Sequence, residues 1–191
     1  MDSKKYFIEY KINDMQSFFN YARDSFKYGW MDQGKKFHQG VNDAENYCLQ
    51  TPGELIESKI GICWDMTELY RYWFSIMTDL KQETYYIFYD DNMGCPSHSI
   101  LVFYQDNLVF WFEPMFYSDD FNYSGIHQYA HISELLKDVK DVFIQYNILK
   151  KVIPEKYDES KIYLYKYTQP KYHINGYQMR NHINRSLFIS G

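Results

Sequence analysis

The chain has 191 residues, of which 46% are hydrophobic and 24% charged, and this suits one domain with a core of its own. The net charge is −5 without a long run of Lys or Arg, which argues against nucleic acid and anionic membranes as partners. No stretch is apolar for long enough to cross a bilayer, and the N-terminus lacks the apolar segment of a signal peptide. Three Cys make no disulfide framework, so we expect a cytoplasmic protein.

Aromatic residues make up 20% of the chain, with 21 Tyr and 14 Phe. A surface that stacks on carbohydrate would explain this excess, and so would the codon usage of an AT-rich genome. Because the aromatic residues are spread along the whole chain, the second explanation is favoured.

The first part of the chain is predicted to be helical. Residues 14–28 carry one apolar stripe of the helical period, and Gly29 is expected to end that helix. Residues 30–50 are expected to be irregular, with Gly34 and Gly40 as breakers.

Two further helices are predicted next. Thr51-Pro52-Gly53-Glu54 has a capping Thr, a Pro at the first helical position and a Glu that closes a capping box. This short helix is expected to stop near Gly61. A second helix is predicted from Cys63 to Met77, with one buried stripe.

The period changes to that of strands after Thr84. Strands are predicted at 85–89, 98–104 and 108–113, with a loop at 90–96.

The last part of the chain mixes both types of element. Residues 125–131 are expected to lead into a helix at 133–139, capped by Ser133. Strands are predicted at 142–149 and 162–167, followed from residue 168 by a polar segment with a final helix. Helices first and a mostly antiparallel sheet afterwards predict the α+β class in one domain, 1–191.

A thiol, an imidazole and a carboxylate follow one another along the chain as Cys63, His98 and Glu113. Each lies at the end of a predicted helix or strand. In thiol-based acyl transfer the thiolate attacks a carbonyl carbon, the imidazole moves the proton, and the carboxylate holds the imidazole in one tautomer. A helix start favours a thiolate, and its backbone N–H groups can later face an oxyanion. The three residues therefore predict a catalytic triad.

The loop between the two later strands decides whether His98 and Glu113 share a face of the sheet. A two-residue loop at Gln105-Asp106 would set the two residues opposite each other. A loop at Asp106-Asn107 would set Glu113 diagonal to His98, still on the same face. A slip of one residue would separate them unless a bulge restored the parity. A helix covering the His98 face, with Cys63 at its tip, would complete the site.

Each of these residues also has an ordinary structural explanation. A Cys at a helix start is often buried filler, a His that opens a strand is often a surface residue, and a Glu before Pro is often a solvated edge residue. Asp65 and Glu68, on the helix that Cys63 begins, are expected to face solvent or a neighbouring Arg.

Zinc is a competing use of the same side chains. Cys95 and His98 have ligand-like spacing, and Cys63 or Cys48 could complete a tetrahedral site. A second paired motif is missing from the sequence. Cys48 and Cys95 are otherwise expected to be structural.

The segments around Cys63 resemble the transglutaminase-like superfamily, and more narrowly its small bacterial members. The resemblance covers residues 47–142, and its most specific part is Lys59-Ile60-Gly61-Ile62-Cys63-Trp64-Asp65. It implies a papain-like core in which a helix with the Cys at its tip packs on an antiparallel sheet bearing His and an acid. The other matching segments are Leu49 to Leu55, Glu68-Leu69, the strand after His98, Trp111 to Glu113, and Gly125-Ile126-His127.

By this resemblance Cys63 would be the nucleophile, His98 the general base and acid, and Glu113 the orienting group. The third member is usually Asp, and Glu113 is one methylene longer. Trp64 and Gln50 are candidates for a further oxyanion donor.

His127 could contact the substrate or the oxyanion, or could simply pack a loop. The resemblance implies an amide-cleaving enzyme, a hydrolase or an acyltransferase that acts on a protein, peptide or other amide through a thioester. It implies no cofactor, metal or calcium. The alternative is an inactive member that binds a peptide or glycan, and the oligomeric state stays open.

Overall fold

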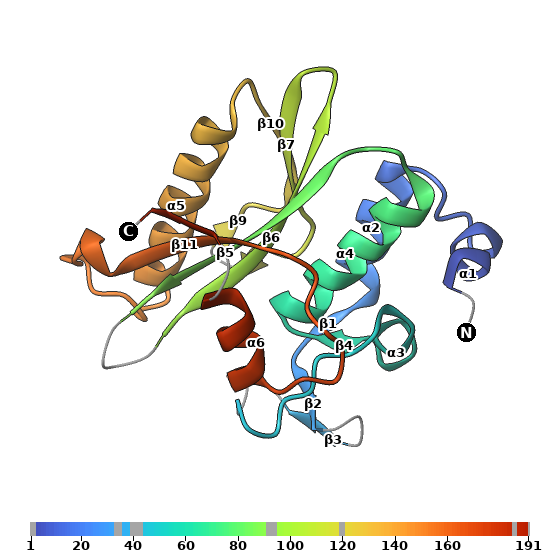
Figure 1. Cartoon of the computed structure of the whole chain (residues 1–191), viewed down its shortest axis with the longest axis horizontal. Helices are drawn as coiled ribbons and strands as arrows, with labels where there is room; N and C mark the ends of the chain where they lie inside the picture. Colours follow the sequence, from blue (N-terminus) through green and yellow to red (C-terminus); the bar gives the residue numbers. More distant parts are fainter. Residues whose placement is uncertain are drawn as a thin grey trace. The chain divides into compact units, whose positions relative to one another are not determined.

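The computed structural model describes residues 3–32, 36–38, 44–90, 95–118, 121–184 and 187–190, and its class is α+β, as predicted (Figure 1). The chain divides into two compact units. The first contains Met1–Leu80 and Gln169–His182, and the second contains Lys81–Thr168 and Ile183–Gly191.

The first unit is mainly helical. Strands β1 and β4 pair in parallel, and β2 pairs with β3 in an antiparallel hairpin. Helix α6 has its last two residues in the second unit. The elements are α1 (Ser3–Glu9), α2 (Met15–Ser25), β1 (Lys27–Tyr28), β2 (Trp30–Asp32), β3 (Lys36–His38), α3 (Pro52–Ser58), β4 (Ile60–Gly61), α4 (Cys63–Met77) and α6 (Gly176–Asn184).

The predicted helix starts of this unit are confirmed, and one predicted end is wrong. The Asp14 side chain accepts from the Ser17 N–H at the start of α2, and Thr51 and Glu54 form the expected capping box of α3. Helix α2 ends at Ser25 because the chain then extends to pair with β4.

The segment at 30–50 was expected to be irregular, but it contains the hairpin of β2 and β3. The proposed breakers Gly34 and Gly40 lie outside the described residues, as do residues 91–94 of the predicted loop.

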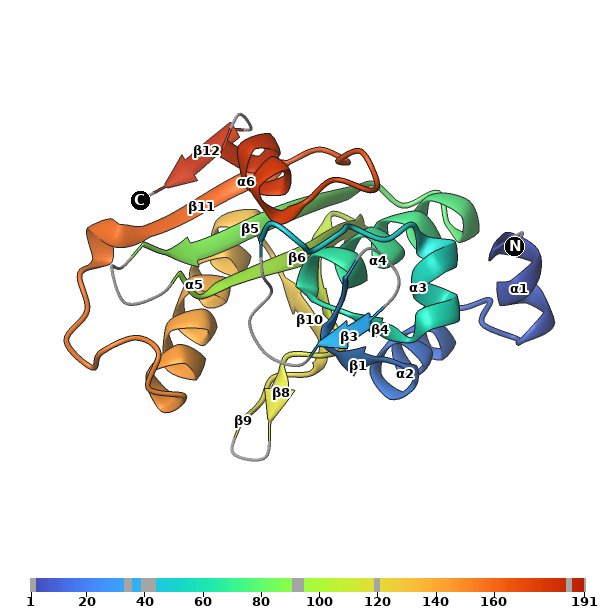
Figure 2. The same ribbon diagram turned by 90° about the horizontal axis from the view of Figure 1, so that it is seen from below.

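The second unit contains a six-stranded sheet in the order β10-β7-β6-β5-β11-β12, and every neighbouring pair in it is antiparallel (Figure 2). The pair β8 and β9 lies outside this sheet. The elements are β5 (Gln82–Tyr89), β6 (Ser97–Gln105), β7 (Leu108–Glu113), β8 (Tyr117–Ser118), β9 (Phe121–Asn122), β10 (Gly125–Tyr129), α5 (Ile132–Leu149), a 3-10 turn (Glu159–Lys161), β11 (Ile162–Tyr167) and β12 (Leu187–Ser190).

Helix α5 corrects the prediction for this part of the chain. A short helix capped by Ser133 and a separate strand at 142–149 were expected, but one helix begins after His131 and runs to Leu149. The apolar run at 142–149 continues the buried stripe that begins at Leu135, and a short apolar run cannot by itself distinguish a strand from a buried helix.

Helix α5 packs on one face of the sheet and forms the core of the second unit. Buried side chains of β5, β6 and β7 meet those of α5 there. The main contributors are Tyr85, Ile87, Ile100, Val102, Trp111, Leu135, Val139, Val142 and Phe143. Within the described residues, we find no helix with the length and apolar character required to span a bilayer.

Candidate active site

Cys63 is the first residue of α4 and is half-buried. The turn into the helix is held by Asp65, which is 1% exposed. Its carboxylate accepts from the N–H of Ile62 and from the N–H of Gln50, each at 3.0 Å. Gly61 is required just before this turn, because a Cβ there would lie 2.9 Å from the Cβ of Asp65. These contacts fix the backbone that presents the thiol.

Asp65 was expected to face solvent or an Arg, and that expectation is wrong. Burial raises the pKa of its carboxyl to about 6, although the two backbone N–H donors act to lower it. Its position three residues after Ile62 is that of the acid in a capping box, and this spacing was the signal that could have identified its role.

Tyr47 lies beside the start of α4, near Asp65 and Trp64, and was not singled out from the sequence. Burial raises the pKa of its hydroxyl, and negative charge at Asp65 and Cys63 acts in the same direction. Its ring centroid is 5.6 Å from that of Trp64, whose side chain is also buried. Two large buried rings, those of Tyr47 and Trp64, therefore pack together at the start of α4.

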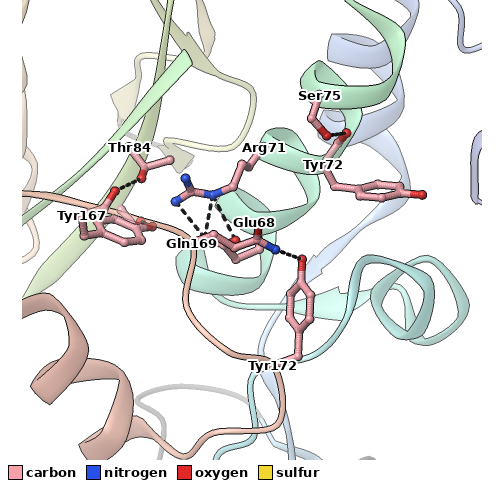
Figure 3. Close-up of polar contacts among 9 residues, drawn as sticks. Glu68, Arg71, Tyr72, Ser75, Thr84, Tyr167, Gln169 and Tyr172 are labelled. Carbon is pink, nitrogen blue, oxygen red and sulfur yellow. Dashed lines mark hydrogen bonds and ion pairs between the residues drawn. The ribbon is translucent and has the colours of Figure 1, made fainter. Parts of the chain in front are cut away.

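Glu68, one turn further along α4, has the Arg partner that the sequence suggested (Figure 3). The Nε of Arg71 donates to its Oε2 at 3.1 Å. Burial raises the pKa of Glu68 to about 7, and Arg71 opposes this shift. Figure 3 also shows the side-chain amide of Gln169 donating to the hydroxyl of Tyr172, at 2.9 Å. The Glu68–Arg71 pair thus joins two residues that lie three positions apart on α4.

Gln50 and Trp64 were the candidates for a further oxyanion donor. The Nε2 of Gln50 donates to the carbonyl of Ile60 at 2.8 Å, and its Oε1 accepts from the Ser58 hydroxyl at 2.8 Å. Through these two hydrogen bonds the side-chain amide of Gln50 links the end of α3 to β4. The Trp64 side chain is 3% exposed and packs in the interior.

His98 and Glu113 meet on one face of the β6–β7 hairpin. The turn is the two-residue loop Asp106-Asn107, in which both residues have positive φ, 51° and 64°. This is the second of the two predicted registers, with Glu113 diagonal to His98. The Nε2 of His98 donates to the Oε2 of Glu113 at 2.7 Å. The side chains are 15% and 3% exposed, so little water competes for this contact.

Two further donors hold the carboxylate of Glu113. The indole Nε1 of Trp111 donates to the same Oε2 at 3.2 Å, and the backbone N–H of Met115 donates to Oε1 at 3.3 Å. The ring of Phe116 stacks on the imidazole of His98, with centroids 4.5 Å apart and planes 13° apart. The pair is thus fixed in position and orientation, and the extra methylene of Glu113 does not prevent the contact.

His127 lies on β10, opposite Trp111. Its Nε2 donates to the carbonyl of Tyr123 at 3.0 Å, and its ring stacks on the Tyr123 ring with centroids 4.1 Å apart. A Cβ at Gly125 would come within 2.9 Å of the imidazole. These contacts favour the packing interpretation of His127 over a substrate contact.

The helix that packs on the His98 face within the second unit is α5. Cys63 belongs to the first unit, and the His98–Glu113 pair belongs to the second. The approach of Cys63 to His98, and with it the papain-like packing of the Cys helix on the sheet, stays a prediction.

The other two Cys differ in environment. Cys95 is exposed, and Cys48 is half-buried. Burial raises the pKa of the Cys48 thiol, with a smaller contribution from Glu54. Among the described residues, there is no group of three or more His, Cys, Asp or Glu that could hold a metal ion.

Comparison with known proteins found no matching family model, no matching curated protein and no matching solved structure.

Proposed function

We propose that the protein is a cysteine-nucleophile enzyme of the transglutaminase-like type that cleaves amide bonds. Cys63 would be the nucleophile, His98 the general base and acid, and Glu113 the orienting group. The observation that supports this most is the 2.7 Å contact between His98 Nε2 and Glu113 Oε2, buried and held by further donors. A carboxylate bound at Nε2 selects one tautomer, so Nδ1 would be the nitrogen that accepts the thiol proton.

The reaction would run in two halves. The Cys63 sulfur attacks the amide carbonyl carbon while its proton passes to His98, and the oxyanion faces the N–H groups at the start of α4. His98 then gives this proton to the leaving amine as the C–N bond breaks, which leaves a thioester. Water or a second amine attacks the thioester, its proton goes to His98 and then to the sulfur, and an acid or a new amide is released.

The proposal predicts that Cys63 reacts faster than the other two thiols. We would label the protein with iodoacetamide at pH 6 and follow each Cys by mass spectrometry, with the exposed Cys95 as the internal reference. A thiol ionised at pH 6 should react about tenfold faster than an ordinary one, after allowance for its lower intrinsic nucleophilicity.

His98→Ala should remove the advantage of Cys63, and Glu113→Gln should reduce it. His131→Ala is the matched control, since His131 is exposed and follows the end of β10 that lies opposite to Gly125, the strand partner of Glu113. Equal rates for Cys63 and Cys95 in the wild type would refute the proposal and favour a binding module for a peptide or glycan.

A further inference from the structure

The hydroxyl of Tyr47 is a buried polar group to which the structure gives no obvious purpose. The side chain is 1% exposed, and its hydroxyl oxygen is closed off from solvent. Within the part of the chain that the structure describes, no group forms a hydrogen bond of normal geometry with this hydroxyl. Such a group is unfavourable in a folded protein, because it has given up its hydrogen bonds to water without gaining another.

The carboxyl of Asp65 lies beside this hydroxyl, and each group acts on the pKa of the other. Burial raises the pKa of Tyr47, and Asp65 raises it further. Burial raises the pKa of Asp65, whereas the N–H groups of Gln50 and Ile62, and after them the Tyr47 hydroxyl, act to lower it. The Oδ1 of Asp65 accepts from Gln50 and its Oδ2 from Ile62. Each carboxylate oxygen has two lone pairs, so there is room for a third donor.

Packing holds both side chains at the turn before α4. The ring of Tyr47 lies 5.6 Å from that of Trp64, between centroids, and the Trp64 side chain is buried. A Cβ at Gly61 would lie 2.9 Å from the Cβ of Asp65, so the backbone before Cys63 packs closely on this residue. The hydroxyl and the carboxyl therefore lie together at the turn that presents the thiol.

We propose that Tyr47 is a positioning residue for Cys63, an inference that rests on the proposed function of this thiol. When Asp65 is ionised, the Tyr47 hydroxyl donates to the carboxylate beside the N–H groups of Gln50 and Ile62. Hydrogen bonds to a charged acceptor are about twice as strong as those between neutral groups, so the turn is held most firmly in this state. Tyr47 acts through Asp65, because its buried hydroxyl cannot touch a substrate.

Three other titratable groups lie close to this pair. Negative charge at Cys63 and at Cys48 acts on Tyr47, and Asp65 acts on both Cys48 and Glu68. A pH profile of the thiol alone could therefore report any of them. The variant Asp65→Asn identifies the part that belongs to Asp65, because Asn has the same shape and does not titrate.

NMR titration of the Asp65 carboxyl carbon tests the link to Tyr47. Tyr47→Phe keeps the ring and removes the donor, so it should raise the pKa of Asp65 from about 6 to about 7. Tyr89→Phe, at a buried tyrosine of the second unit, is the control and should leave this pKa unchanged. An unchanged pKa in Tyr47→Phe overturns the proposal. If this variant does not fold, the Cζ signal of Tyr47 in the wild type should move as Asp65 titrates, and a constant signal overturns the proposal too.

Alkylation of Cys63, measured relative to Cys95, tests the effect on the nucleophile. Tyr47→Phe should slow it between about pH 6 and about pH 7, where Asp65 is ionised in the wild type and protonated in the variant. The two proteins should agree at about pH 5 and about pH 8.5, and Tyr47→Phe should have no effect in the Asp65→Asn background.

Equal slowing at every pH would indicate a purely structural role for Tyr47. Faster alkylation in the window would show that the charge of Asp65, rather than the turn, reaches the thiol. Either result overturns the proposal. If Cys63 has no advantage over Cys95 in the wild type, the proposed function fails, whereas the NMR titration still decides whether Tyr47 donates to Asp65.

Discussion

Replacing Asp65 by Asn should abolish a loss of stability that the wild-type protein shows as the pH rises from about 4 to 6. Burial raises the pKa of this carboxyl from 3.8 to about 6. Below pH 3.8 the group is protonated in both states. Between the two values the unfolded chain has released the proton and the folded protein has kept it, so the free energy of unfolding falls with rising pH. This rise in the pKa corresponds to a loss of about 3 kcal/mol in the free energy of unfolding.

The measurement is urea unfolding, followed by tryptophan fluorescence, at pH 4 and pH 7. The wild type should lose about 3 kcal/mol relative to Asp65→Asn between these conditions. Asp79→Asn, at an exposed position of the same unit, is the matched control and should follow the wild type. Parallel pH profiles for the wild type and Asp65→Asn would show that the buried carboxyl does not titrate as the structure implies.

Asp65→Ala separates the charge from the hydrogen bonds. It leaves the buried N–H groups of Gln50 and Ile62 without their acceptor, and each such loss costs about 1–3 kcal/mol. At pH 4, where the carboxyl is neutral in the folded protein, Asp65→Ala should therefore be less stable than Asp65→Asn, which keeps one acceptor. Equal stability of the two variants would contradict the role of Asp65 in holding the start of α4.

Three further changes test other contacts. Gly61→Ala would place its Cβ 2.8–2.9 Å from two side chains and should lower the free energy of unfolding by about 1–3 kcal/mol; an unchanged melting temperature would contradict the close packing. Trp111→Phe keeps a ring but removes the donor to Glu113, so it should cost about 1 kcal/mol and slow the alkylation of Cys63; wild-type values for both would show that the indole does not position the carboxylate. Burial alone would raise the pKa of the Glu83 carboxyl, but its hydrogen bonds, above all the one from Lys166, lower the pKa from 4.5 to about 2. The stability that this carboxylate contributes should therefore be present above pH 4.5 and lost as the pH falls toward 2. Melting curves at pH 3 and pH 6 for the wild type and Glu83→Gln would measure this loss, and an equal change in both proteins would contradict it.

Local patterns predicted the separate parts of the candidate site well. The bounds of α4, Cys63–Met77, agree with the prediction, and so does the capping box at Thr51. The prediction that His98 and Glu113 share one face of the hairpin is also confirmed. The face on which a strand residue lies depends on the register, and a loop with an even number of residues keeps the two side chains on the same face. These features depend on residues a few positions apart, where hydrogen bonds and φ preferences act directly.

Features that depend on distant partners were predicted poorly. The run at 142–149 was assigned to a strand because its apolar residues fit either period, and the helix is selected by the sheet face that it buries. Asp65 was assigned to solvent or a neighbouring Arg, because nothing nearby in the chain reveals that the N–H of Gln50, 15 residues away, would meet it.

The chain's own pattern was sufficient for the α+β class, for Cys63 at a helix start, and for His98 and Glu113 on one face of a hairpin. The insertion of β11 beside β5, the choice of α5 to cover the His98 face, and the burial of Asp65 emerged from the folded structure alone. The reason is that capping and turn energies arise between neighbours in sequence, whereas burial is a property of surfaces that the chain brings together from afar.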